Sequence, residues 1–286
     1  MTEQKSIPSN LHGRIAWIVL ALLLTLRIPF TFAIIYSLPI ENQNGAAFYE
    51  IGTYLLTAFL IWWERERLAE FHIDSLALAF IILLRPLQTL ILGYWRVETP
   101  LAFPKPLGLS LWAISIGLFV SLRISGFRPA RLSTRTSAWL AAGLAAGVCI
   151  SAAENLGAFL SAIKDPARGT GESHLLVSSS LTLLYHLGFA PINEEPLFRG
   201  FLWGFLRRRG WKEGWILPFQ AALFGFAHVY FASQYPLRFW LFIPFSGILF
   251  GLFAWRSRSI APAMLAHGLI NGSVYVLVLA LIPLFL

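Results

Sequence analysis

The sequence predicts an all-α protein, a polytopic transmembrane helical bundle of about nine spans with a cytoplasmic N-terminus. Hydrophobic residues make up 57% of the 286 residues and charged residues only 13%, whereas soluble domains carry about 25% charged residues. The apolar residues also form continuous stretches long enough to cross about 30 Å of hydrocarbon. Such stretches, rich in Leu, Phe and Ala, indicate helices, because barrel strands alternate in short segments.

Nine apolar windows follow one another along the chain. They lie near residues 15–38, 46–63, 75–95, 107–122, 137–162, 174–206, 213–232, 238–255 and 259–285. The window 174–206 is too long for one simple span and contains Pro191. It is therefore either one kinked, tilted helix or a span followed by a broken second helix. The predicted count is nine crossings, with ten as the alternative.

The distribution of Lys and Arg predicts the orientation, because cytoplasmic loops of membrane proteins are enriched in these residues. With the N-terminus inside, the cytoplasmic segments hold most of the 22 basic residues, namely Lys5, Arg14, Arg65, Arg67, Arg123, Arg128, Arg131, Arg135, Arg207, Arg208, Arg209, Lys212, Arg256 and Arg258. The opposite loops hold only Arg96, Lys105, Lys164, Arg168 and Arg238.

The same asymmetry, together with attraction to anionic lipid, accounts for the net charge of +8. A nucleic-acid partner is not expected, because it would need a basic face on a soluble surface. Cys149 is the single cysteine, which excludes an intrachain disulfide and a cysteine-based metal cluster.

The chain divides into two parts by its polar content. Residues 1–135 are predicted to be N-terminal transmembrane helices without a recognised motif, and 136–286 carries every polar constellation. In the first part, Arg27 and Arg85 lie near prolines, where a kink frees carbonyls that a guanidinium can bind; contact with a lipid phosphate or a substrate is the alternative. Glu50 and His72 are expected to be solvated at membrane interfaces.

Three polar groups interrupt the apolar windows of the second part. They are Glu194-Glu195 with Arg199, His228, and His267 with Asn271. An ionisable side chain at the centre of a bilayer costs about 3 kcal/mol on insertion scales, so this concentration of polar residues indicates a site. At 1.5 Å per residue from the nearest cytoplasmic basic residue, Glu194, His228, His267 and Asn271 lie about 20, 24, 14 and 20 Å deep, in roughly one layer.

Helical spacing predicts which of these side chains face one another. At about 100° per residue, Arg199 lies about 40° from Glu195 and about 140° from Glu194. Glu195 and Arg199 are therefore expected to form an i,i+4 ion pair, which leaves Glu194 without a local partner. His267 and Asn271 share one helix face, and the ring of Phe224 is expected to pack beneath the imidazole of His228.

This set of residue types suits the hydrolysis of a peptide or similar acyl bond. A carboxylate such as Glu194 can take a proton from water while one imidazole holds that water or shuttles the proton. A second imidazole and an amide can donate to a developing oxyanion. Alternatively Glu194, His228 and His267 could bind a divalent metal such as zinc, with water in the open position. The sequence contains no H-E-x-x-H helix, and metal-free activation of water stays open beside the metal.

The three motifs resemble those of the CPBP family. Glu194-Glu195-Pro196-Leu197-Phe198-Arg199, Phe224 to His228, and His267 to Asn271 match E-E-x-x-x-R, F-x-x-x-H and H-x-x-x-N in order. This family includes type II CAAX prenyl endopeptidases and bacterial Abi or bacteriocin-immunity proteins, and the resemblance covers roughly residues 140–285.

The resemblance implies an intramembrane endopeptidase, of metalloprotease or glutamate type, in a bacterial-type inner membrane. It implies that residues 136–286 are the catalytic core and that the substrate is a peptide or lipidated protein in the bilayer. Glu194, His228, His267 and Asn271 would be catalytic, with Glu195, Arg199 and Phe224 supporting them. A non-catalytic immunity or scaffold protein of the same fold is the main alternative, and a proton-coupled transporter is a weaker one, because no inverted repeat is visible.

Overall fold

The computed structural model describes residues 9–36, 43–156, 160 and 172–273, and the regular secondary structure of these residues is helical. The first half contains α1 (Ser9–Tyr36), α2 (Gln43–Trp63), the 3₁₀ helix η1 (Arg65–Phe71), α3 (Ser75–Tyr94), α4 (Pro106–Ile124) and α5 (Thr134–Glu154). The second half contains α7 (Glu172–Leu187), α8 (Ala190–Glu195), η3 (Pro196–Leu202), α9 (Trp203–Arg208), α10 (Glu213–Phe226), α11 (Phe231–Gln234), η4 (Arg238–Phe242), α12 (Ile243–Ser257) and α13 (Ala261–Gly272).

Six helical stretches in the described residues are long and apolar enough to cross a membrane. They are Leu11–Ile28, Asn44–Trp63, Ser75–Tyr94, Pro106–Ile124, Thr134–Glu154 and Arg238–Ser257. Each coincides with one of the predicted windows, so the chain is a multi-pass membrane protein, and the secondary structure of its described residues is all helical. The windows 174–206, 213–232 and 259–285 contain shorter helices, and the last part of the final window, 274–285, lies outside the described residues.

The long window 174–206 is interrupted, which corresponds to the second of its two predicted alternatives, a helix followed by a broken second helix. α7 ends at Leu187, and α8 begins at Ala190 with Pro191 in its first turn. Gly188 lies in the break, where a Cβ atom would overlap the carbonyl of Leu84 on α3. The absence of a side chain at Gly188 therefore lets the break pack directly on α3.

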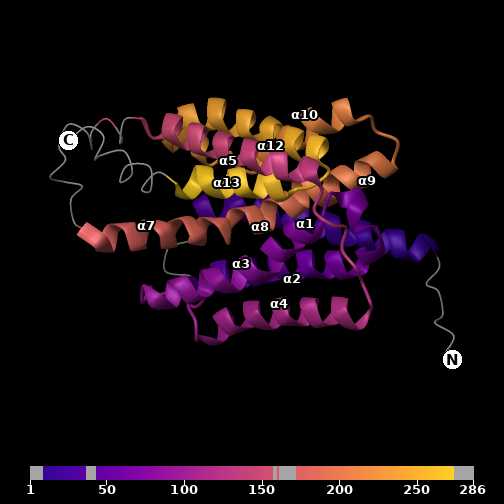
Figure 1. Cartoon of the computed structure of the whole chain (residues 1–286), viewed down its shortest axis with the longest axis horizontal. Helices are drawn as coiled ribbons and strands as arrows, with labels where there is room; N and C mark the ends of the chain where they lie inside the picture. Colours follow the sequence, from indigo (N-terminus) through magenta and orange to yellow (C-terminus); the bar gives the residue numbers. More distant parts are fainter. Residues whose placement is uncertain (1–8, 37–42, 157–159, 161–171, 274–286) are drawn as a thin grey trace.

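The helices form two groups with the α7–α8 segment between them (Figure 1). One group contains α1 to α4, and the other contains α5, α10, α12 and α13. α7 contacts α3 on one side and α13 on the other, and α8 contacts α2, α3 and α13. Residues at the end of α8 are consequently surrounded by other helices of the protein and not by lipid.

The close packing of α5 against α13 depends on two glycines spaced four residues apart. A Cβ atom on Gly143 would lie 2.6 Å from the carbonyl oxygen of Pro262, and one on Gly147 would lie 2.7 Å from Cβ of Leu269. Small residues at this spacing allow membrane helices to approach closely and gain van der Waals contact. This contact places α13, which carries His267, in the interior of the bundle.

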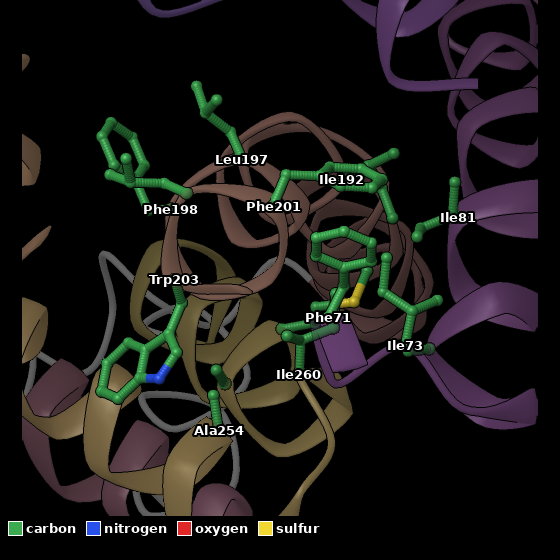
Figure 2. Packing of buried hydrophobic residues seen from close by; sticks show 14 of the residues in the cluster. Phe71, Ile73, Ile81, Ile192, Leu197, Phe198, Phe201, Trp203, Ala254 and Ile260 are labelled. Atoms are coloured by element: carbon green, nitrogen blue, oxygen red, sulfur yellow. The ribbon is translucent and has the colours of Figure 1, made fainter. Parts of the chain in front are cut away.

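Aromatic and branched side chains around η3 connect the two helix groups. Figure 2 shows Phe198, Phe201 and Trp203 from η3 and α9 in one packed cluster with Phe71 and with Ile260 of the second group. All five side chains are fully buried. Because the cluster joins residues from both parts of the sequence, η3 and the carboxylates just before it are held in a fixed position.

Two expectations about individual residues are wrong. Glu50 and His72 were expected to be solvated, but both are buried. Glu50 forms an ion pair with Arg85 and accepts a hydrogen bond of 2.9 Å from Asn193. Nε2 of His72 accepts a hydrogen bond of 3.3 Å from Arg207. The sequence reveals only the position of each residue within its own window, whereas these contacts come from helices far away in the chain.

Candidate functional site

Glu194 and Glu195 lie at the C-terminal end of α8, and both are almost completely buried. The chain continues without a break into η3, a π-helical segment that begins at Pro196. Proline has no N–H group to donate to the preceding turn, and short π-helical segments are frequent at functional sites. The two carboxylates therefore lie at a local irregularity of the helix, inside the bundle.

Glu195 forms the predicted ion pair with Arg199. Nη1 of Arg199 lies 3.3 Å from Oε1 of Glu195, and Nη2 donates a hydrogen bond of 3.2 Å to the carbonyl of Gly247. The guanidinium carbon lies 4.2 Å from the ring centroid of Phe224, within cation–π range. Charge, hydrogen bonds and the aromatic ring together stabilise an arginine that is fully buried.

Glu194 has a partner that the sequence did not indicate. Its Oε1 forms an ion pair with Arg27 of α1, and Arg27 also donates a hydrogen bond of 3.1 Å to the hydroxyl of Tyr49 on α2. The expectation that Arg27 binds carbonyls freed at a proline kink does not describe this contact. An arginine in an apolar window predicts some acidic partner, but the sequence alone could not select which carboxylate.

The second oxygen of Glu194 faces both histidines. Oε2 lies 3.6 Å from Nε2 of His228 and 4.0 Å from Nε2 of His267. Both separations exceed normal hydrogen-bond distances, and Oε2 is a buried oxygen without a hydrogen-bond partner in the described part of the chain. The sequence-based expectation that Glu194, His228 and His267 share one layer agrees with these distances.

The other ring nitrogens determine which atoms of the histidines carry hydrogen. Nδ1 of His228 lies 2.7 Å from the carbonyl oxygen of Phe224, and Nδ1 of His267 lies 2.7 Å from Oε1 of Glu195. A carbonyl and a carboxylate can only accept hydrogen bonds, so each Nδ1 is the donor. In the neutral rings Nε2 is then an acceptor, and both acceptors are directed toward Oε2 of Glu194.

The sequence predicts that His228 lies within a helix, but in the structure it does not. α10 ends at Phe226, and His228 follows in a turn. Its hydrogen bond to Phe224 nevertheless keeps the expected i,i+4 relationship, with ring centroids 4.5 Å apart. Phe224 also lies edge-on to His267 at 5.9 Å. Phe224 thus contacts both imidazoles and the guanidinium of Arg199.

Asn271 lies one turn beyond His267 on α13, as predicted. Its side-chain oxygen accepts a hydrogen bond of 3.2 Å from Arg238 of η4. Arg238 also lies 3.6 Å from the carboxylate of Glu154 on α5. The charge distribution had placed Arg238 in a loop opposite the cytoplasm, and no sequence motif associated it with the site. With Oδ1 bound to Arg238, the amide nitrogen of Asn271 is the atom available to donate.

The donor atoms fit a divalent cation chemically, although no group of three or more His, Cys, Asp or Glu side chains is assembled as a metal centre among the residues that the structure describes. Two imidazole nitrogens and one carboxylate oxygen form a known catalytic zinc set, and ligands about 2 Å from a tetrahedral ion lie about 3.3 Å apart. The separations from Oε2 of Glu194 to the two Nε2 atoms are somewhat longer than this. Hydrogen bonds to both Nδ1 atoms are also typical of metal-binding histidines.

These features define a class of protein, a multi-pass membrane protein with a buried, charge-balanced carboxylate–histidine site inside its helix bundle. Residues 176–273 match the model of the family described as type II CAAX prenyl endopeptidase Rce1-like. This match supports placing the segment in the CPBP/CAAX protease family, whose members are hydrolases. No curated protein and no solved structure matches the chain. The matched segment contains the three motifs, whereas Arg27 lies outside it.

Proposed function

We propose that the protein is an intramembrane endopeptidase that hydrolyses a peptide bond of a membrane-associated substrate. The main observation is the buried Oε2 of Glu194, which has no hydrogen-bond partner in the described residues and faces the acceptor nitrogens of His228 and His267. An unsatisfied buried polar atom costs about 1–3 kcal/mol, and Oε2 of Glu195 also lacks a partner among the described residues. What distinguishes Oε2 of Glu194 is that it faces two imidazole nitrogens at once. A reactive water between Oε2 and Nε2 of His228 would satisfy both atoms.

In the proposed reaction, water donates one hydrogen to Glu194 and the other to His228, which directs its lone pair toward the substrate carbonyl. Glu194 or His228 takes the proton as the oxygen of water bonds to the carbonyl carbon. The same group then protonates the leaving nitrogen as the carbon–nitrogen bond breaks, so that the proton balance closes.

The negative oxygen formed during attack needs hydrogen-bond donors. The amide nitrogen of Asn271 can donate directly. His267 can donate from Nε2 only when that nitrogen carries a proton in addition to Nδ1, which donates to Glu195. If a divalent metal binds Glu194, His228 and His267 instead, it would supply an activated water and polarise the carbonyl.

The substrate class follows from the surroundings of the site. The site is enclosed in a bundle of apolar helices, which favours a substrate that is itself associated with the membrane. We propose a membrane-tethered or lipidated peptide. We further propose nine crossings with the N-terminus in the cytoplasm of a bacterial-type inner membrane, residues 136–286 as the catalytic core and residues 1–135 as helices that support it.

The proposal is tested with purified protein in lipid nanodiscs and a quenched fluorescent peptide library that carries a lipid-modified cysteine. Glu194→Gln and His228→Ala are expected to lower turnover at least about 100-fold, as the loss of a general base does. Glu213→Gln is the matched control, because Glu213 pairs with Arg207 and Arg258 away from the site. Full turnover by a folded Glu194→Gln protein would refute the proposed reaction.

Metal dependence is measured on the same samples by elemental analysis and chelation. Loss of turnover on chelation, restored by added zinc, would support a metal bound by Glu194, His228 and His267. Full turnover without bound metal would support direct activation of water by the carboxylate.

A further inference from the structure

We infer that Arg27 is a positioning residue for Glu194, so that the first helix of the chain completes a site whose other residues lie in 176–273. The inference rests on the proposed endopeptidase function. It begins from the ion pair between Arg27 and Oε1 of Glu194, which joins residues 167 positions apart. Arg27 lies outside the segment that matches the protease family.

The contact divides the two oxygens of Glu194 between different partners. Arg27 binds Oε1, and Oε2 is directed at His228 and His267. A carboxylate rotates freely about its terminal bond unless its oxygens are held. Binding of one oxygen by a guanidinium therefore fixes the direction of the other, which is the oxygen that the proposed reaction requires.

The guanidinium is itself held in place. Nη1 of Arg27 donates to the hydroxyl of Tyr49 on α2, and the Arg27 side chain is only 15% exposed. α1 packs against both α2 and η3. The position of Arg27 therefore depends on both α1 and α2, and Arg27 links these two helices to the carboxylate of Glu194.

Glu195 shows why a distant arginine is needed. Its partner Arg199 is one turn away in the same segment, and the two adjacent carboxylates project in different directions. Arg199 cannot pair with both of them, because it lies on the side of Glu195. Glu194 must be balanced by a charge from another helix, since a buried unpaired charge is strongly destabilising.

The first measurement is a double-mutant cycle on thermal unfolding in nanodiscs, which does not depend on activity. Arg27→Met is expected to lower Tm, because it leaves a buried carboxylate unpaired. Arg27→Met combined with Glu194→Gln is expected to recover most of that loss, because both charges are then absent. Additive losses in the double variant would show that the two side chains do not act as a pair and would overturn the inference.

The second measurement separates positioning from folding. Arg27→Lys keeps a cation and is expected to retain most of the turnover, whereas Arg27→Met is expected to lower kcat about 100-fold with little change in KM. Arg208→Met is the control, because Arg208 pairs with the buried Glu64 away from the site; it is expected to keep kcat. A folded Arg27→Met protein with normal kcat would refute the positioning role, while an inactive wild type would refute the proposed function instead.

Discussion

Nδ1 of His267 donates a hydrogen bond of 2.7 Å to Oε1 of Glu195, across 72 positions of sequence. The same oxygen accepts from Arg199. Glu195 thus connects an arginine of η3 to a histidine of α13, and it determines that Nε2 of His267 is directed toward Glu194. The second carboxylate of the motif has a role of its own, which is to orient the imidazole.

Glu195→Gln is therefore expected to reduce turnover without abolishing folding. The amide oxygen of Gln can still accept from His267, but a hydrogen bond to a neutral amide orients the ring less strongly than one to a charged carboxylate. Loss of a partner that orients a site histidine typically costs about 10–100-fold. Turnover is compared with that of Glu195→Asp, which keeps the charge but shortens the side chain. A Glu195→Gln protein with normal turnover would show that the charge is not needed.

Gly147 is expected to tolerate no side chain, because the backbone of α13 lies directly against it. Gly147→Ala places a methyl group 2.7 Å from Cβ of Leu269 and 2.9 Å from the carbonyl oxygen of Ala266, so a lower Tm and displacement of His267 are expected. Gly117 on α4 is the control, since nothing lies within 4 Å of the position that a methyl group would occupy there. Gly117→Ala is expected to leave Tm equal or raise it, because Ala favours helices by about 1 kcal/mol. Equal effects at both positions would contradict the close packing.

Phe224→Ala is expected to be strongly destabilising, because the ring fills the space among His228, His267 and Arg199. Truncation of a buried Phe to Ala typically costs about 3–5 kcal/mol. Phe224→Leu is expected to fold but to lose turnover, because a Leu side chain does not provide an aromatic face to the imidazole and the guanidinium. Phe245→Leu is the control, since Phe245 on α12 is exposed. Unchanged Tm in Phe224→Ala would contradict this role.

The stability of the protein is expected to fall with decreasing pH through His72, which lies between α2 and α3. Burial, with a further contribution from Arg207 and Arg258, lowers the pKa of His72 from 6.5 to about 3. Below pH 6.5 the unfolded chain binds a proton at this residue that the folded protein does not bind. The free energy of unfolding consequently decreases as pH falls from about 6.5 toward 3, by up to about 1.4 kcal/mol per pH unit.

The measurement compares Tm between pH 7 and pH 5 for the wild type and for His72→Gln. Gln cannot be protonated but can still accept from Arg207, so the variant is expected to lose less stability over this range. Identical pH dependence in the two proteins would show that His72 does not contribute.

The helices and the local pairs could be predicted from the sequence because they depend on neighbouring residues. Apolar stretches of about 20 residues must form helices in lipid, where backbone groups have no other partner. The i,i+4 pairs Glu195–Arg199 and Phe224–His228 follow from helical periodicity, and both are present. Even the turn at His228, which follows the early end of α10, preserves the second pair.

Contacts between distant helices were decided only by the tertiary structure. A buried charge requires a partner, but lipid gives no indication of which one, and Arg27 could have paired with any acidic residue at a similar depth. Glu50 and His72 were expected to be solvated because they lie near the predicted ends of apolar windows. Their positions in the sequence do not reveal that other helices cover them. Apolar length and local spacing were enough to predict the membrane helices and the residue types of the site. Packing of α1, α8 and α13 decided which oxygen of Glu194 binds an arginine and which faces the histidines.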